Sequence, residues 1–126
     1  MQTGWQSAHK HQKDKEGRTA CLRHVTTVTA TKLVLLLPVL AATGWPSLPW
    51  LCAGIALDAG SHYWADRRFT LEWLANKINK MGFYQLGTDS LHRDAPDGSH
   101  MGTGKYALDQ AFHHLFLFVS AVLISL

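Results

Sequence analysis

Hydrophobic and polar residues lie in separate blocks along the chain. Polar residues dominate 1–23 and 67–105, whereas the segments between and after these blocks are strongly apolar. A helix of about 20 apolar residues is long enough to cross the roughly 30 Å hydrocarbon core of a bilayer. The pattern therefore predicts an all-α integral membrane protein, a helical bundle with three transmembrane helices and one amphipathic helix at the membrane interface.

The three predicted spans differ in character. They lie at 20–43, 46–64 and 107–126. The first span is rich in threonine and carries Pro38, which predicts a kink, and the second is interrupted only by Asp58 and His62. The third contains nothing more polar than serine after His114. Lys32, near the middle of the first span, is expected to face the bundle interior or to snorkel, because a lone charge against lipid costs about 2.5 kcal/mol or more.

Polar segments connect and precede these spans. They are an arm at 1–19, an amphipathic helix at 70–81 and a loop at 82–106. The helix is expected because apolar residues recur at helical spacing between charged ones, with the apolar side lying on the membrane surface. The loop is rich in Gly, Asp, Ser, Pro and His, which predicts low order.

The distribution of basic residues predicts the orientation. Of twelve Lys and Arg, five lie at or before the start of the first span and six follow the second, and only Lys32 lies well within a span. The positive-inside rule then places the N-terminus and the long loop in the cytoplasm, in a multi-pass protein of the cell (inner or plasma) membrane. A net charge of +3 is too mild to indicate nucleic-acid binding. Cys21 and Cys52 lack the spacing of a metal or disulfide motif.

Ionisable residues of the three spans fall at one predicted membrane level, the cytoplasmic one. They are His24 in the first span, Asp58, His62 and Asp66 in or just after the second, and Asp109 and His113 in the third. The spacings i, i+4 and i+8 put the acidic and imidazole groups of each helix on one face. Asp66 and His114, taken singly, are explained by a solvated helix boundary.

The set Asp58, His62, Asp109 and His113 favours a functional interpretation, because ionisable groups inside a membrane are expensive and usually serve function. Imidazole and carboxylate ligands suit Zn²⁺ or Mn²⁺, and a site with open positions can activate water for hydrolysis. The sequence contains no HExxH motif, nucleophile elbow or P-loop that would specify another chemistry.

Four pieces of the chain stand out as motifs: Cys21-Leu22-Arg23-His24-Val25, Ser61-His62-Tyr63-Trp64-Ala65-Asp66-Arg67-Arg68, Gly82-Phe83-Tyr84-Gln85-Leu86-Gly87 and Gly102-Thr103-Gly104-Lys105-Tyr106-Ala107-Leu108-Asp109-Gln110. Together they resemble an uncharacterised family of small bacterial and phage membrane proteins of unknown function. That family is distantly similar to membrane-bound metal-dependent hydrolases. The resemblance implies a metal site formed by His24, His62, Asp66, Asp109 and His113.

Members of that family usually begin with a further helix bearing His-x-x-x-Asp, which runs into the Gln-Thr found here as Gln2-Thr3. The chain begins where that helix ends, which predicts either an upstream start or a shortened form with an incomplete site. Two functions stay open: a metal-dependent hydrolase, or a non-enzymatic holin-like or accessory membrane protein whose Asp/His pairs are interhelical hydrogen bonds. The expected partners are the lipid bilayer and further copies of the chain.

Overall fold

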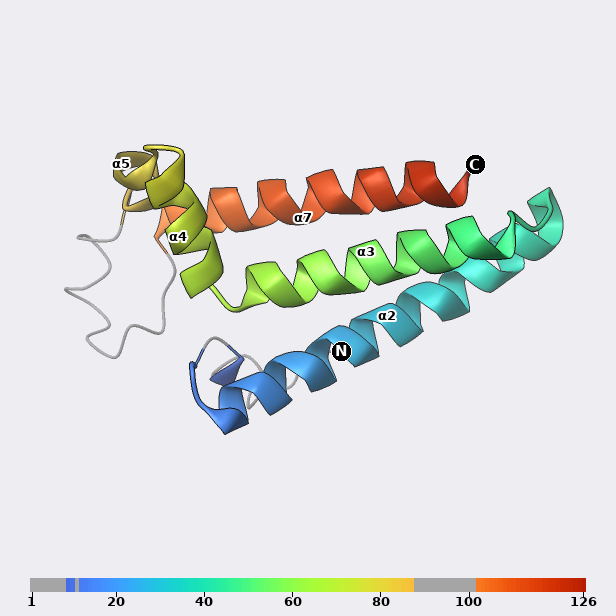
Figure 1. The fold of residues 1–126 in the computed structure, drawn as a ribbon, viewed down its shortest axis with the longest axis horizontal. Coiled ribbons are helices and arrows are strands. Elements are labelled where there is room, and N and C mark those ends of the chain that lie inside the picture. Colours follow the sequence, from blue (N-terminus) through green and yellow to red (C-terminus); the bar gives the residue numbers. More distant parts are fainter. Residues whose placement is uncertain (1–8, 11, 88–101) are drawn as a thin grey trace.

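The computed structural model describes residues 9, 10, 12–87 and 102–126, and this part of the chain is helical and has no strand. The helices are α2 (Lys15–Thr43), α3 (Leu48–Asp66), α4 (Phe69–Lys77), α5 (Met81–Tyr84) and α7 (Thr103–Ile124). The three long helices run side by side with α3 between α2 and α7, and α4 and α5 cover one end (Figure 1). The all-α prediction is confirmed.

Local capping explains where α2 begins and ends. The Asp14 carboxylate accepts a hydrogen bond of 2.7 Å from the backbone N–H of Gly17, so the helix starts at Lys15, ahead of the predicted span. The helix continues through Pro38 and stops at Gly44, whose φ of 107° is open to glycine at no steric cost. Gly44 still donates its N–H to the carbonyl of Leu40 at 2.9 Å.

Helix α3 approaches α7 closely because small residues meet at their contact. A Cβ atom on Gly54 would lie 2.8 Å from the backbone oxygen of Ser120 and would also collide with Ile124. Ser120 is itself only 2% exposed. Small residues at such a contact let two helix backbones approach, as in many membrane bundles. Helix α2 packs on the other side of α3, and α2 and α7 make almost no direct contact.

The segment predicted as one amphipathic helix at 70–81 is divided in two. Helix α4 ends at Lys77, and Asn79 takes a left-handed conformation with φ of 56° before α5 begins. Asparagine tolerates that conformation better than most residues, because its short polar side chain bonds locally. The apolar period alone gave no signal for this break.

A small core fixes α4 and α5 to the ends of α3 and α7. Its buried residues are Ala65, Leu71, Ala75 and Tyr84, with Trp64, Met81, Leu108 and Phe112 packed around them. The pKa of the Tyr84 hydroxyl is raised, mainly because burial disfavours the phenolate, so Tyr84 is neutral in this core. This core holds the end of α3 that carries Asp66 against the start of α7.

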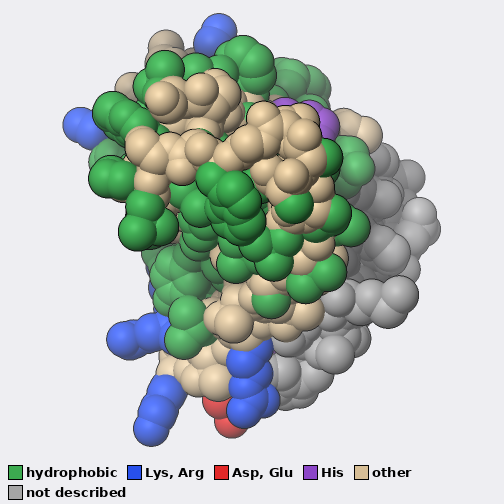
Figure 2. Space-filling model, turned by 90° about the vertical axis from the view of Figure 1, so that its right-hand side faces the viewer, with side chains coloured by type: hydrophobic (Ala, Val, Ile, Leu, Met, Phe, Trp, Pro, Cys, Tyr) green, Lys and Arg blue, Asp and Glu red, His purple; other side chains and the backbone are tan. Residues whose placement is uncertain are grey.

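Two of the described helices, α2 and α7, are long and apolar enough to cross a membrane. Only 11% of the most apolar stretch of α2 and 6% of that of α7 is buried within the chain. Seen from the end that carries the α2–α3 turn, hydrophobic side chains cover much of the surface (Figure 2). Helix α3 has 19 residues and is not one of these two. The predicted low order of the polar loop falls mainly on 88–101, outside the described residues.

Candidate metal centre

All six residues predicted as metal ligands line one polar cavity of about 310 Å³. They come from three helices: His24 from α2, Asp58, His62 and Asp66 from α3, and Asp109 and His113 from α7. The cavity lies near the end of the bundle where α4 and α5 dock. Three segments far apart in the sequence thus bring their titratable side chains to one place, as the helical spacing predicted.

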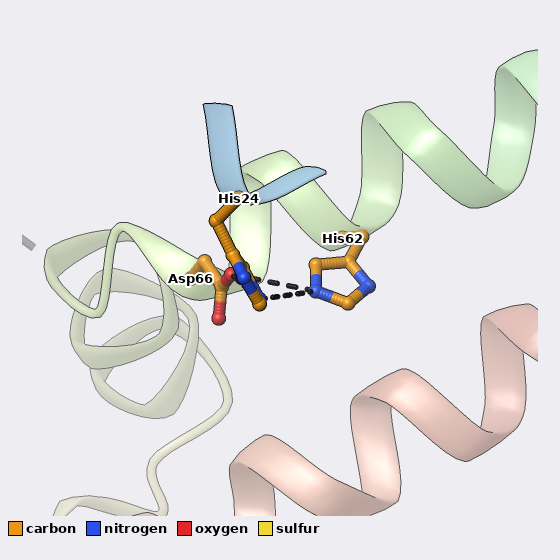
Figure 3. Close-up of side chains that lie close together, drawn as sticks. All are labelled: His24, His62 and Asp66. Carbon is orange, nitrogen blue, oxygen red and sulfur yellow. Dashed lines mark hydrogen bonds and ion pairs between the residues drawn. The ribbon is translucent and has the colours of Figure 1, made fainter. Parts of the chain in front are cut away.

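His24, His62 and Asp66 form the tightest group in this polar cavity, and their side chains point toward one another (Figure 3). The Nε2 atom of His24 lies 3.3 Å from Oδ2 of Asp66, and that of His62 lies 3.4 Å from the same oxygen. The two Nε2 atoms are 3.4 Å apart. One carboxylate oxygen and two imidazole nitrogens therefore make a nearly equilateral triangle.

The size of this triangle matches a zinc site. Zinc binds imidazole nitrogen and carboxylate oxygen at about 2.0–2.2 Å, and the ligand atoms of a tetrahedral site are then about 3.3–3.6 Å apart. The three measured separations, 3.3, 3.4 and 3.4 Å, agree with that range. A single ion could contact all three atoms without a large movement of any side chain.

Two buried atoms of this group make no hydrogen bond within the described part of the chain. They are Oδ2 of Asp66 and Nδ1 of His24. Asp66 is 4% exposed and His24 is 7% exposed. Oδ2 lies 3.3 and 3.4 Å from the two imidazole nitrogens, and an ion placed among these three atoms would replace long contacts with direct metal–ligand bonds. The residues therefore fit a metal in their chemistry as well as in their spacing.

A second group shares Asp66 and extends to α7. Asp66, Asp109 and His113 offer ligand atoms that all lie within 4.8 Å of one another. His113 Nδ1 lies 2.8 Å from the backbone oxygen of Asp109, and because a carbonyl can only accept, this nitrogen carries the proton. The other nitrogen, Nε2, is then free to bind a metal and lies 4.0 Å from Oδ1 of Asp66. Hydrogen bonds of this kind orient metal-binding histidines.

Asp58 lies apart from both groups and has a different partner. Both of its carboxylate oxygens accept hydrogen bonds of 2.8 Å from the ammonium of Lys32. The side chain of Asp58 is 13% exposed and that of Lys32 is 36% exposed. Lys32 thus faces the bundle interior, one of the two placements expected for it. Asp58 was predicted as a ligand; it pairs with Lys32 and belongs to neither metal-capable group among the described residues, so its role as a ligand stays a prediction.

Lys10 is a site residue that the sequence did not reveal. Its ammonium lies 2.7 Å from Oδ1 of Asp66, and its backbone oxygen faces the guanidinium of Arg67 at 3.4 Å. The arm was expected to be a cytoplasmic extension, and Lys10 within it lines the polar cavity. No local signal could show this, because the contact joins residues 56 positions apart.

His114 also lines the polar cavity, but it belongs to neither metal-capable group among the described residues.

No protein-family model, curated protein or solved structure matches the chain. The family resemblance stays a prediction.

Proposed function

We propose that the chain is an integral membrane protein that binds Zn²⁺ or Mn²⁺ between its helices and uses the metal for hydrolysis. The observation that carries the proposal is the buried Asp66 carboxylate, around which three imidazoles gather from three helices. If these histidines served only as hydrogen-bond partners of Asp66, one or two imidazole rings would satisfy the carboxylate, and a third would not be needed. Ionisable residues inside a membrane bundle usually mark function.

The ligand set favours a catalytic rather than a purely structural metal. A zinc ion held by three protein ligands keeps a fourth position for water, whose pKa it lowers to about 7. His24, His62 and Asp66 would be these three ligands. Asp109 lies across the polar cavity, 3.7 Å from Nδ1 of His113, and its carboxylate could accept a proton from such a water.

Elemental analysis of detergent-purified protein tests metal binding directly. Wild-type protein should carry about one Zn or Mn per chain, and His62→Ala should lose it. His114→Ala is the matched control, because it removes a histidine from the same polar cavity but outside both groups, and it should keep the metal. Equal metal content in all three proteins, or none in any, would contradict the proposal.

Hydrolysis is tested on the same samples. Metal-loaded wild-type protein and His114→Ala should cleave a chromogenic ester or phosphoester, and His62→Ala should not. Dialysis against a chelator should abolish the activity, and added Zn²⁺ or Mn²⁺ should restore it. Activity that survives complete metal removal would exclude the metal-dependent reaction.

We further propose that α3 crosses the membrane together with α2 and α7, with the N-terminus in the cytoplasm. Its position between the other two long helices supports this, as does the absence of Lys and Arg from the α2–α3 turn. Single cysteines at Ser47 and Asn76, in a background with Cys21 and Cys52 replaced by serine, test it. An impermeant maleimide added to intact cells should label position 47 only, and labelling of position 76 would contradict the topology.

A non-enzymatic assembly role is the second candidate, and the pair Lys32–Asp58 favours it. This pair is complete without any metal and joins α2 to α3 as an interhelical link. In such a protein, which would act as an oligomer in the manner of holins, chelation should leave both stability and oligomeric state unchanged. A metal protein should instead lose stability on chelation, because bound ligand stabilises the folded state.

A further inference from the structure

An apolar groove continues from the polar cavity along the bundle. It has a volume of about 240 Å³ and shares Lys32, Asp58 and Leu117 with the polar cavity. Beyond these three it is lined by apolar or small residues of all three long helices, among them Leu33 and Leu36 of α2, Ile55 of α3 and Ala121 and Ile124 of α7. A polar cavity and an apolar groove therefore join end to end at the ion pair.

The groove opens sideways. Helix α3 packs against both neighbours, whereas α2 and α7 make almost no direct contact, so the space between α2 and α7 is the unclosed side of the bundle. If the three helices span the bilayer, this side faces lipid. A molecule could enter the groove from the membrane without passing through water.

The groove is short enough to lie within one leaflet of a bilayer. Along α7 the polar cavity extends from Asp109 to Leu117, and the groove continues from Leu117 to Ile124. At 1.5 Å per residue, the groove is about 10 Å long, which is less than half of the roughly 30 Å hydrocarbon core. A lipid with its head group in the polar cavity would therefore have its chain in the same leaflet.

The charges of the polar cavity favour an anionic head group. The ammonium groups of Lys10 and Lys32 line it together with the carboxylates of Asp58, Asp66 and Asp109, and a bound divalent metal would change the formal sum of these charges from −1 to +1. Anionic oxygens are good ligands for an open metal position and good acceptors for lysine. A neutral or cationic head group would gain neither contact.

We infer that the joined cavity and groove bind an anionic membrane lipid, with its head group at the metal centre and its chain between α2 and α7. This inference rests on the proposed metal function and names the substrate class of that same site. It commits to a lipid of the surrounding leaflet rather than to a soluble anion or to a second copy of the chain.

The test uses full-length protein in bilayer nanodiscs that contain a phosphatidic acid with a photoreactive diazirine in its chain. After irradiation, the crosslinked residues are identified by mass spectrometry. We expect crosslinks at Leu33, Leu36 and Ile124. Equal labelling of Val34 and Leu35, which point outward from α2 and are 68% and 67% exposed, would indicate ordinary boundary lipid and overturn the inference.

Two tryptophan variants provide a matched pair. Ala121→Trp fills the groove, whereas Val122→Trp places the same bulk on the neighbouring residue, which does not line it. Groove crosslinking should fall about tenfold in Ala121→Trp and stay unchanged in Val122→Trp. Equal crosslinking in the two variants would overturn the inference.

Metal content separates this inference from the proposed function. Both tryptophan variants should keep the metal found in wild-type protein, because neither position belongs to a metal-capable group. If wild-type protein holds metal but shows no groove crosslinks, the metal proposal stands and the lipid inference fails. If wild-type protein holds no metal, the metal proposal fails, and the lipid inference fails with it.

Two further outcomes identify other occupants. Glycerol 3-phosphate, which has the anion without the chain, should not displace the photoreactive lipid, and efficient displacement would show that the site takes a soluble anion. In a background with Cys21 and Cys52 replaced by serine, Ala121→Cys should stay monomeric under oxidation. A disulfide between two copies would place a second copy at the groove and overturn the lipid assignment.

Discussion

Two carboxylates on the same face of α3, those of Asp58 and Asp66, have different sets of polar neighbours. Asp58 has one partner, the Lys32 ammonium, which donates to both of its oxygens. Asp66, two turns further on, is surrounded by Lys10 and three histidines, yet its Oδ2 atom makes no hydrogen bond within the described chain. The comparison shows that spacing along a helix selects candidates, whereas the partners from neighbouring helices decide which carboxylate lies in a group that could hold a metal.

The largest expected effect is on metal affinity, when each of the two carboxylates is replaced in turn by an amide. Asp66→Asn removes the shared ligand of both groups and should lower metal affinity more than about 100-fold, since even the loss of an outer-shell contact costs 10–100-fold. Asp58→Asn should retain the metal. Competition with a fluorescent zinc chelator measures both. Comparable losses in the two variants would remove the distinction between the carboxylates.

The next largest effect concerns the contribution of the Lys32–Asp58 ion pair to the free energy of unfolding. Lys32→Met leaves the Asp58 carboxylate without its partner and should lower the free energy of unfolding by about 2–3 kcal/mol. This is below the 3–5 kcal/mol typical of a fully buried pair, because the Lys32 side chain is 36% exposed. Unfolding in mixed micelles with increasing SDS measures the change. The double variant Lys32→Met/Asp58→Leu should recover most of it, and failure to recover would point to lost packing instead.

A similar stability effect is expected at Gly54, where α3 contacts α7. This contact lies between Asp58 and the α2–α3 turn. Gly54→Val would place side-chain atoms against Ser120 and Ile124 and should cost about 1–3 kcal/mol. Gly60→Ala on the same helix faces open space, so it should be neutral or stabilise by up to about 1 kcal/mol. Thermal unfolding in detergent compares them. Equal stability would mean that the close helix contact is not required.

The smallest effect is expected at Lys10. Lys10→Met removes a cation from Oδ1 of Asp66 and should raise metal affinity by about fivefold, because the positive charge opposes a metal ion at the same carboxylate. Lys13→Met, a neighbouring change that leaves this contact intact, is the control. Chelator competition gives the ratio, and weaker metal binding in Lys10→Met would show that the arm supports the site rather than competing with the ion.

The sequence predicted the helical class, the convergence of His24, His62, Asp109 and His113, and the inward position of Lys32 as one of two options. These follow from apolar period and from i, i+4 spacing, which are properties of single helices. It did not predict that Asp66 is central, since a carboxylate next to Arg67 also suits a solvated helix end. That distinction depends on how three helices pack.

The other differences also have long-range or local causes that hydrophobic pattern does not encode. The contact of Lys10 with Asp66 depends on where the arm folds back. The pairing of Lys32 with Asp58 depends on how far α2 and α3 are shifted relative to each other along their axes. The break in the segment 70–81 depends on the left-handed backbone conformation of one residue, Asn79.

The ammonium of Lys10 occupies one side of Asp66 in this structure, and this has a kinetic consequence. Metal loading at the second group, where Oδ1 of Asp66 is the oxygen nearest to His113, would then be an exchange of one cation for another, in which the arm has to release this oxygen before the ion binds it. In stopped-flow mixing, the loading rate should level off as the metal concentration rises, at the rate of that release. The arm would thus set how quickly the protein responds to metal, separately from how tightly it holds it.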